Sequence, residues 1–172
     1  ELKPTSAQLD AVQKRTLRVL VAAQIFSGAG LAAGVTVGAL LAQEMFGSTG
    51  MAGVPSALFT IGSAAAAAGV GQLSQRFGRR IGLATGYLTG ALGSVGIVAA
   101  AVIDNISLLF AALFVYGAGT ATNLQARYAG ADLAHHDRRA RAISTVLVAT
   151  TVGAVIGHNL VGVLGDLAGA IG

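Results

Sequence analysis

The sequence predicts an all-α polytopic membrane protein with five full transmembrane helices, and three observations lead to this fold class. The chain is 54% hydrophobic and only 10% charged, with a mean hydropathy of +0.73. Soluble domains carry about 25% charged residues, so this composition is typical of a membrane protein. Five apolar runs follow one another along the chain, and the basic residues fall in alternate connections between those runs.

Each apolar run has 18 or more residues nearly free of charge, which is enough to cross a hydrocarbon core of about 30 Å. The first run follows basic residues, as the core of a signal peptide does, but it is far longer than a cleavable core of about 7 to 15 residues. We therefore expect it to be a membrane helix. The expected spans are 17–43, 50–75, 81–103, 106–126 and 142–165.

The ends of the chain suggest its place in a larger bundle. Residues 1–16 precede the first span, and a sixth span would begin shortly after Gly165. The chain also lacks an initiator Met. We therefore expect residues 1–172 to be the amino-terminal transmembrane bundle of a longer protein, including the approach to a sixth helix.

Basic residues occur only on one side of the expected membrane. Lysine and arginine are confined to the amino-terminal segment and to the connections between spans two and three and spans four and five. The opposite connections, around 44–49, 104–105 and Asp166, carry acids and no base. Positive charge is retained on the cytoplasmic side, so the amino terminus, including residues 1–16, is predicted to be cytoplasmic. The basic residues are Lys3, Lys14, Arg15, Arg18, Arg76, Arg79, Arg80, Arg127, Arg138, Arg139 and Arg141.

The connection after the second span reads GQLSQRFGRR. It resembles the GxLaDrxGRR signature that members of the major facilitator superfamily carry between their second and third helices. Gln75 stands where the family has an aspartate of a cytoplasmic charge network. The positions in register are Gly71, Leu73, Arg76, Gly78, Arg79 and Arg80.

A second motif lies between spans four and five, in DLAHHDRRARA. It resembles the acidic residue and RGRA-like string of the same family, with Asp132 followed by Arg139 and Arg141, and with Ala140 in place of the usual glycine. An arginine fork can hold a carboxylate bidentately, so Arg79 or Arg80 is expected to bridge to Asp132 and bias a cytoplasmic gate. The alternative is that these arginines only meet lipid headgroups and water.

Small residues recur at intervals of four inside the expected helices. This spacing places them on one face, where the absence of side chains allows neighbouring backbones to approach. We expect close helix packing at Gly30, Gly34, Gly38, Gly82, Gly86 and Gly90, at Gly153 and Gly157, and in the alanine block 64–68.

Polar side chains form a stripe along the fourth span. Tyr116, Thr120, Asn123 and Arg127 share one face of the helix, and lipid offers them no partners. The resemblance implies that the first and fourth helices line a central substrate cavity, so these residues and Gln24 are substrate-cavity candidates. Hydrogen bonding between helices is the alternative.

The fifth span reads TTVGAVIGHNLVGVLG and resembles the family's antiporter motif GxxxGPxxGG, with His158 at the proline position. Histidine keeps the backbone donor that proline lacks and adds a titratable ring. His158 is therefore either a structural residue paired with another group, or a proton-coupling or substrate-contacting residue.

Several other classes of protein lack their chemistry here. The chain contains no cysteine and no HExxH, GxSxG or P-loop string, so we expect neither an enzyme nor a cofactor. His135, His136 and Asp137 are adjacent loop residues without a spaced third ligand, so no metal site is expected. The topology accounts for the basic residues, so no nucleic-acid partner is expected either.

The resemblance implies the amino-terminal half of a twelve-helix secondary transporter, built of inverted three-helix repeats and working by alternating access. Its expected partners are a small-molecule substrate, the lipid bilayer and the carboxy-terminal half of the same protein, in a bacterial inner membrane. Proton-coupled efflux is one mode that the sequence leaves open. The alternative is a half-length membrane scaffold without transport activity.

Overall fold

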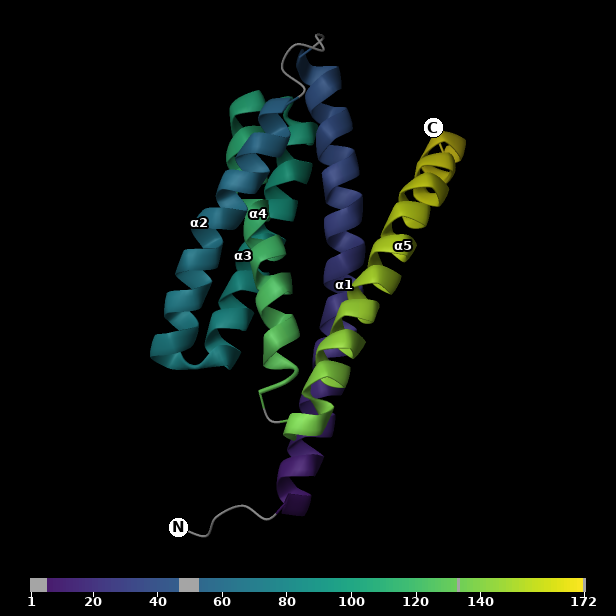
Figure 1. Cartoon of the computed structure of the whole chain (residues 1–172). Helices are drawn as coiled ribbons and strands as arrows, with labels where there is room; N and C mark the ends of the chain where they lie inside the picture. The colour runs from purple at the N-terminus through teal and green to yellow at the C-terminus, as the bar shows by residue number, and fades with distance from the viewer. Residues whose placement is uncertain (1–5, 47–52, 133, 172) are drawn as a thin grey trace. The chain divides into compact units, whose positions relative to one another are not determined.

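The computed structural model describes residues 6–46, 53–132 and 134–171. Within these residues all regular elements are helical (Figure 1). Lys3 and residues 47–49, which are expected on opposite sides of the membrane, lie outside the described residues. The elements are α1 (Ser6–Phe46), α2 (Gly53–Phe77), α3 (Arg79–Val102), α4 (Ile106–Ala129), the 3-10 helix η2 (His136–Arg138) and α5 (Arg139–Ile171).

The five α helices are each long and apolar enough to cross a membrane, which confirms the predicted fold class for the described part of the chain. Their outer faces carry large apolar side chains: Phe26 and Val102 are each 80% exposed. In a soluble domain such groups would be a liability, whereas lipid accommodates them.

The helices extend beyond the apolar runs. Helix α1 begins at Ser6 and α5 continues to Ile171. Glu44 and Asp166, which were expected in connections, lie within α1 and α5. Hydropathy reports the part of a helix that sits in hydrocarbon, while backbone hydrogen bonds extend the helix through polar residues on either side.

The chain divides into two compact units, each considered by itself. The first unit comprises the described residues of Glu1–Gly30 and Asn123–Gly172, and the second those of Leu31–Thr122. Helices α1 and α4 therefore contribute to both units.

In the second unit, α2 and α3 form an antiparallel hairpin (Figure 1). Glycines on α3 bring it close to its neighbours: a Cβ at Gly82 would overlap Ser74 of α2, and one at Gly93 would overlap the backbone of Tyr116 on α4. Close packing of this kind compensates for the lack of a hydrophobic driving force between helices in lipid. The apolar core of the unit consists of Ala42, Ile97, Ala100, Leu109, Ala112, Leu113 and Tyr116.

Helix α2 packs through other small residues than its alanine block. Ala64, Ala65, Ala67 and Ala68 are exposed, whereas Gly62 is buried. A Cβ at Gly62 would overlap the carbonyl of Phe114, and one at Gly117 would overlap the carbonyl of Phe59. The contact with α4 therefore lies one turn before the block, and a run of alanines has no preferred face by which to predict it.

A short turn joins α3 to α4. The backbone N–H of Asn105 donates to the carbonyl of Ala100 at 3.0 Å, and the Asn105 side chain accepts from the N–H of Leu108 at 2.9 Å. An asparagine in this position satisfies one of the free N–H groups at the start of α4. The two hydrogen bonds tie the end of α3 and the start of α4 to the same residue, Asn105.

Candidate functional site

A buried cluster of polar side chains lies inside the first unit, at the depth of the membrane-spanning segments. Nε2 of Gln24 on α1 donates to Oδ1 of Asn123 on α4 at 2.9 Å and to its backbone carbonyl at 3.2 Å. The same nitrogen donates to Oγ1 of Thr150 on α5, also at 2.9 Å. Gln24 is fully buried and Asn123 is 3% exposed. Three helices thus meet at one amide nitrogen.

The other amide of the cluster extends it along α1. Nδ2 of Asn123 donates to Oγ of Ser27 at 3.2 Å. Thr150 donates to the carbonyl of Val146 in its own helix at 3.1 Å, with Oδ1 of Asn123 at the longer distance of 3.5 Å. We call Gln24, Ser27, Asn123 and Thr150 the polar cluster. An amide nitrogen carries two hydrogens, so the Nε2 of Gln24 shares them among three acceptors.

Glycines allow α1 and α5 to approach closely enough for these bonds. A Cβ at Gly153 would overlap the carbonyl of Ile25, and one at Gly157 would overlap the carbonyl of Ala29. From the other side, a Cβ at Gly28 would lie 2.5 Å from the carbonyl oxygen of Thr150. The close approach of the two backbones lies beside the polar cluster and positions Thr150 for its bond to Gln24.

The members of the polar cluster are all neutral, so the chemistry available there is hydrogen bonding. Amides and hydroxyls both donate and accept, and in a low-dielectric interior each bond is stronger than in water. Leaving one of these groups without a partner is costly for the same reason. The arrangement suits either holding helices together or exchanging its internal bonds for bonds to a polar ligand.

The remaining residues of the α4 stripe have different surroundings. Tyr116 is 5% exposed in the apolar core of the second unit, with its ring tilted against Phe59 at a centroid distance of 5.9 Å. A Cβ at Gly34 would overlap the Tyr116 ring, and one at Gly38 would lie 3.0 Å from Leu113. Thr120 is half-buried.

Arg127 lies near the end of α4, in the first unit, and is half-buried. Its Nε has no hydrogen-bond partner among the residues that the structure describes. An arginine N–H in this position is available to an acceptor. The helical spacing indicated which face of α4 these side chains occupy, but not which neighbour each one meets.

The turn between α2 and α3 consists of Gly78. Its φ of 88° lies in a region that side-chain-bearing residues rarely adopt, and it opens α3 directly before Arg79 and Arg80. Arg76, Arg79 and Arg80 are exposed and Gly71 is half-buried. Gly78 is thus required by the backbone at this turn, and the arginines project from either side of it.

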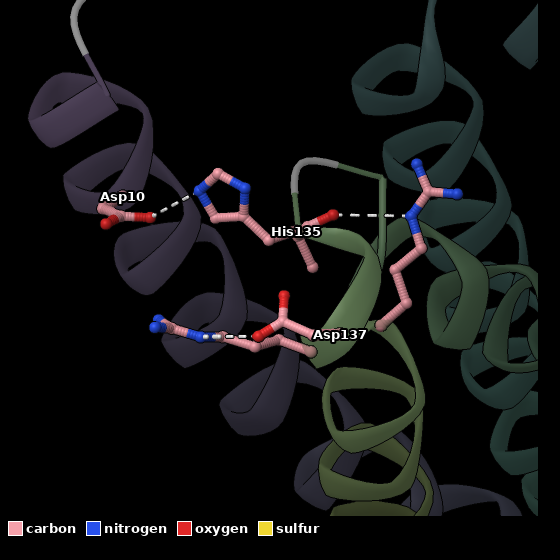
Figure 2. Close-up of polar contacts among 6 residues, drawn as sticks. Asp10, His135 and Asp137 are labelled. Atoms are coloured by element: carbon pink, nitrogen blue, oxygen red, sulfur yellow. Dashed lines mark hydrogen bonds and ion pairs between the residues drawn. The ribbon is translucent and has the colours of Figure 1, made fainter.

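The connection between α4 and α5 contains the second motif, and Asp132 there is exposed. Figure 2 shows the contacts around η2: Nε2 of His135 lies 3.6 Å from Oδ1 of Asp10, and Nε of Arg138 lies 3.8 Å from Oδ2 of Asp137. Nε of Arg139 donates to the carbonyl of Ala134 at 3.4 Å. Exposed pairs of this kind contribute about 0 to 1 kcal/mol each, so they shape the connection only weakly.

His158 is exposed on α5, with Nδ1 at 3.2 Å from the carbonyl of Ala154 one turn earlier. Gly162, the further glycine of the antiporter-like motif, has open space where a Cβ would be, and so does Gly30 on α1. On α3, a Cβ at Gly86 would overlap Thr122, and one at Gly90 would lie 3.0 Å from Gly119. Within the described residues, no three His, Cys, Asp or Glu side chains gather as metal ligands would.

The sequence singled out Gln24 and Asn123 but gave no indication of Thr150 or Gly28. A threonine that bonds its own helix is common in membrane spans, so Thr150 gave no distinct signal. The available signal was its position three residues before Gly153, on the same face of α5.

Comparison with known proteins gives a consistent result. Residues 20–171 match the Major Facilitator Superfamily as a family. The chain is 61% identical over 162 residues to the uncharacterized MFS-type transporter YdeG of Bacillus subtilis, which covers 94% of this chain and 38% of that protein. It is 59% identical over 159 residues to the uncharacterized MFS-type transporter YddS of the same organism, covering 92% of this chain and 36% of that protein.

A third relative has a named substrate. The chain is 33% identical over 150 residues to the riboflavin transporter RfnT of Brucella anthropi, covering 86% of this chain and 37% of that protein. The chain thus spans less than two fifths of the length of each of these three relatives. No solved structure matches it.

Proposed function

The chain belongs to the major facilitator superfamily, and on that premise we propose that the protein is a secondary transporter that moves a small solute by alternating access. The observation that carries the proposal is the polar cluster, a neutral hydrogen-bonding group buried in membrane-spanning segments from three helices. Polar groups within membrane spans are costly in lipid and commonly line substrate pathways.

The composition of the polar cluster supports a substrate class. Gln24, Asn123 and Thr150 offer amide and hydroxyl groups and no charge, which suits a neutral solute that carries hydroxyl, amide or imide groups. A relative is named a riboflavin transporter, and riboflavin is such a solute. We propose riboflavin as the first compound to test.

The experiment is uptake or efflux of labelled riboflavin in vesicles that contain the intact protein. Gln24→Leu is expected to lower the initial rate about fivefold to a hundredfold, since leaving a buried hydrogen-bond partner unsatisfied costs about 1 to 3 kcal/mol and about 1.4 kcal/mol is tenfold. Gln43→Leu, on the exposed side of the same helix, is the matched control and is expected to retain the rate. Unchanged transport in Gln24→Leu would remove the polar cluster from the substrate path.

The scaffold alternative predicts a different result. A scaffold would show no transport of riboflavin or of other neutral polar solutes by the correctly inserted intact protein, together with stable self-association through its glycine faces. The family match supports transport, and nothing in the two units favours the scaffold more strongly.

Access from water can be tested at Thr120, which is half-buried, against Leu124, which is 47% exposed on another face of α4. Residues 1–172 contain no cysteine, so once any cysteine elsewhere in the intact protein is replaced, a single introduced cysteine is the reporter. We expect Thr120→Cys to react with a small water-soluble thiol reagent, and substrate to slow the reaction. Reaction of Leu124→Cys alone would identify the stripe as a packing surface.

The proposed orientation places the amino terminus in the cytoplasm of a bacterial cell. Cysteine at Gln75, which is exposed beside the α2–α3 turn, is expected to react with an impermeant reagent only from inside. Cysteine at Ser48 is expected to react only from outside. Labelling of both positions from one side would contradict the proposed topology.

Proton coupling is a further proposal, centred on His158. Its ring lies on an exposed face of α5, with Nδ1 at 3.2 Å from the carbonyl of Ala154 in its own helix, and ionisable side chains inside membrane spans commonly belong to proton relays. His158→Gln is expected to abolish the dependence of transport on a proton gradient while leaving substrate exchange intact. A retained gradient dependence would assign His158 a structural role.

A further inference from the structure

A basic pocket of about 310 Å³ lies in the first unit, between the first turns of α1 and the start of α5. Lys14 contributes to it from α1, Arg138 from η2 and Arg141 from α5. His135 and Asp10 lie at its edge, where Figure 2 shows them facing one another.

The charges in the basic pocket are unbalanced. Three permanent cations face one carboxylate, and that carboxylate, Asp10, is 3.6 Å from His135. Arg138 has Asp137 at 3.8 Å, with both side chains more than 60% exposed. Within the described residues, no carboxylate lies within ion-pair distance of Lys14 or Arg141. These two cations are therefore available to an anion.

The start of α5 adds to this positive potential. The first turn of the helix contains Arg139 and Arg141 and no acidic residue. The amino-terminal end of a helix carries a partial positive charge, so cations there are unfavourable unless an anion is near. Nε of Arg139 donates to the carbonyl of Ala134, which holds its side chain against the connection.

The lining of the basic pocket places it at the membrane surface. Leu17 and Ala142 line it on the apolar side, and each begins a membrane-spanning run. Gln13, on its wall, donates from Nε2 to the carbonyl of Gly130 at 2.8 Å and so fixes α1 against the end of α4. A ligand with an anionic head and an apolar tail matches a pocket that has cations on one side and apolar residues on the other.

We propose that the basic pocket binds the phosphate of an anionic phospholipid, with Lys14, Arg138 and Arg141 holding the phosphate and the acyl chains lying along the apolar side of α1. Basic pockets between membrane helices bind anionic headgroups by this chemistry. A soluble phosphate ester has the same anionic group but no acyl chains to contact the apolar side of the pocket. The proposal is independent of which solute is transported.

The test measures lipid binding to the intact, delipidated protein in detergent by native mass spectrometry and by the shift in unfolding temperature. The probes are phosphatidylglycerol, phosphatidylcholine and glycerol 3-phosphate. We expect phosphatidylglycerol to bind at least about tenfold more tightly than phosphatidylcholine. The Lys14→Gln/Arg141→Gln double variant is expected to lose this preference, while Arg15→Gln, an exposed neighbour outside the pocket, retains it within about twofold.

Three results would overturn the proposal: equal binding of the two lipids, an unchanged preference in the double variant, or binding of glycerol 3-phosphate as tight as that of phosphatidylglycerol. The last result would assign the pocket to a soluble phosphate ester. If the double variant does not fold, Arg138→Gln replaces it, because that side chain is 67% exposed and its loss leaves the packing intact. An unchanged preference in Arg138→Gln would then count against the site.

Discussion

Gln24 and Asn123 are joined by two hydrogen bonds from a single nitrogen, which reaches both the side-chain and the backbone oxygen of Asn123 at 2.9 and 3.2 Å. The residues are 99 positions apart in sequence, so this link ties α1 to α4 directly. The same nitrogen donates to Oγ1 of Thr150, so the link also includes α5.

Removing the Asn123 side chain is expected to destabilise the protein. Asn123→Ala leaves Gln24 and Ser27 each without one partner, at a cost of about 1 to 3 kcal/mol in a buried site and nearer 1 kcal/mol if membrane helices find other partners. The measurement is the unfolding temperature of the intact protein in detergent. Asn159→Ala is the matched control, because Asn159 is exposed and bonds only its own helix at Val155. Equal effects of the two substitutions would mean that the polar cluster adds no stability.

The crossing of α1 and α5 predicts strong size selection on α5. Gly153→Ala and Gly157→Ala each place a methyl group on the α1 backbone, so we expect a loss of about 1 to 3 kcal/mol or a parallel loss of function from forced separation of the helices. Gly162→Ala, with open space around it, is expected to have no such effect. The measurement is the unfolding temperature together with the transport rate, and equal tolerance at all three positions would contradict the close crossing.

The glycine of the α2–α3 turn can be compared with a glycine in the interior of α2, since alanine is expected to affect the two positions differently. Gly78→Ala forces a side chain into a φ of 88° and is expected to cost about 1 to 3 kcal/mol. Gly69→Ala, in the open interior of α2, is expected to be neutral or to stabilise the protein by up to about 1 kcal/mol, because alanine favours helix. Unfolding in detergent measures both. Equal effects would show that the strain at residue 78 is relieved elsewhere.

The gate proposal pairs Arg79 with Asp132. Reversing either charge, as Arg79→Asp or Asp132→Arg, is expected to impair transport without preventing membrane insertion, and the double reversal is expected to restore part of the activity. Arg76→Asp combined with Asp132→Arg is the control, and we expect no rescue there. A double reversal no more active than the single variants would show that Arg79 and Asp132 do not pair.

The sequence predicted the number and order of the membrane helices because hydrophobic length and the distribution of arginine depend on the bilayer rather than on packing. It located Gln24 and Asn123 because amides stand out in apolar runs. The sequence did not show that Asn123 and Tyr116, which share a face of α4, have different surroundings. Asn123 hydrogen-bonds polar side chains in the first unit, whereas Tyr116 packs in the apolar core of the second. Periodicity defines a face, whereas the partner on that face depends on how the helices pack.

The single-residue connection at Gly78 has a consequence for biosynthesis. With no spare length between them, the end of α2 and the start of α3 stay together at one membrane surface, so during insertion the two helices are constrained to form an antiparallel hairpin. The three arginines beside the turn do not cross the hydrocarbon readily. They would therefore keep the closed end of the hairpin at the membrane surface where the chain is synthesised. Residues inserted beside Gly78 would loosen this constraint and let the two helix ends move apart.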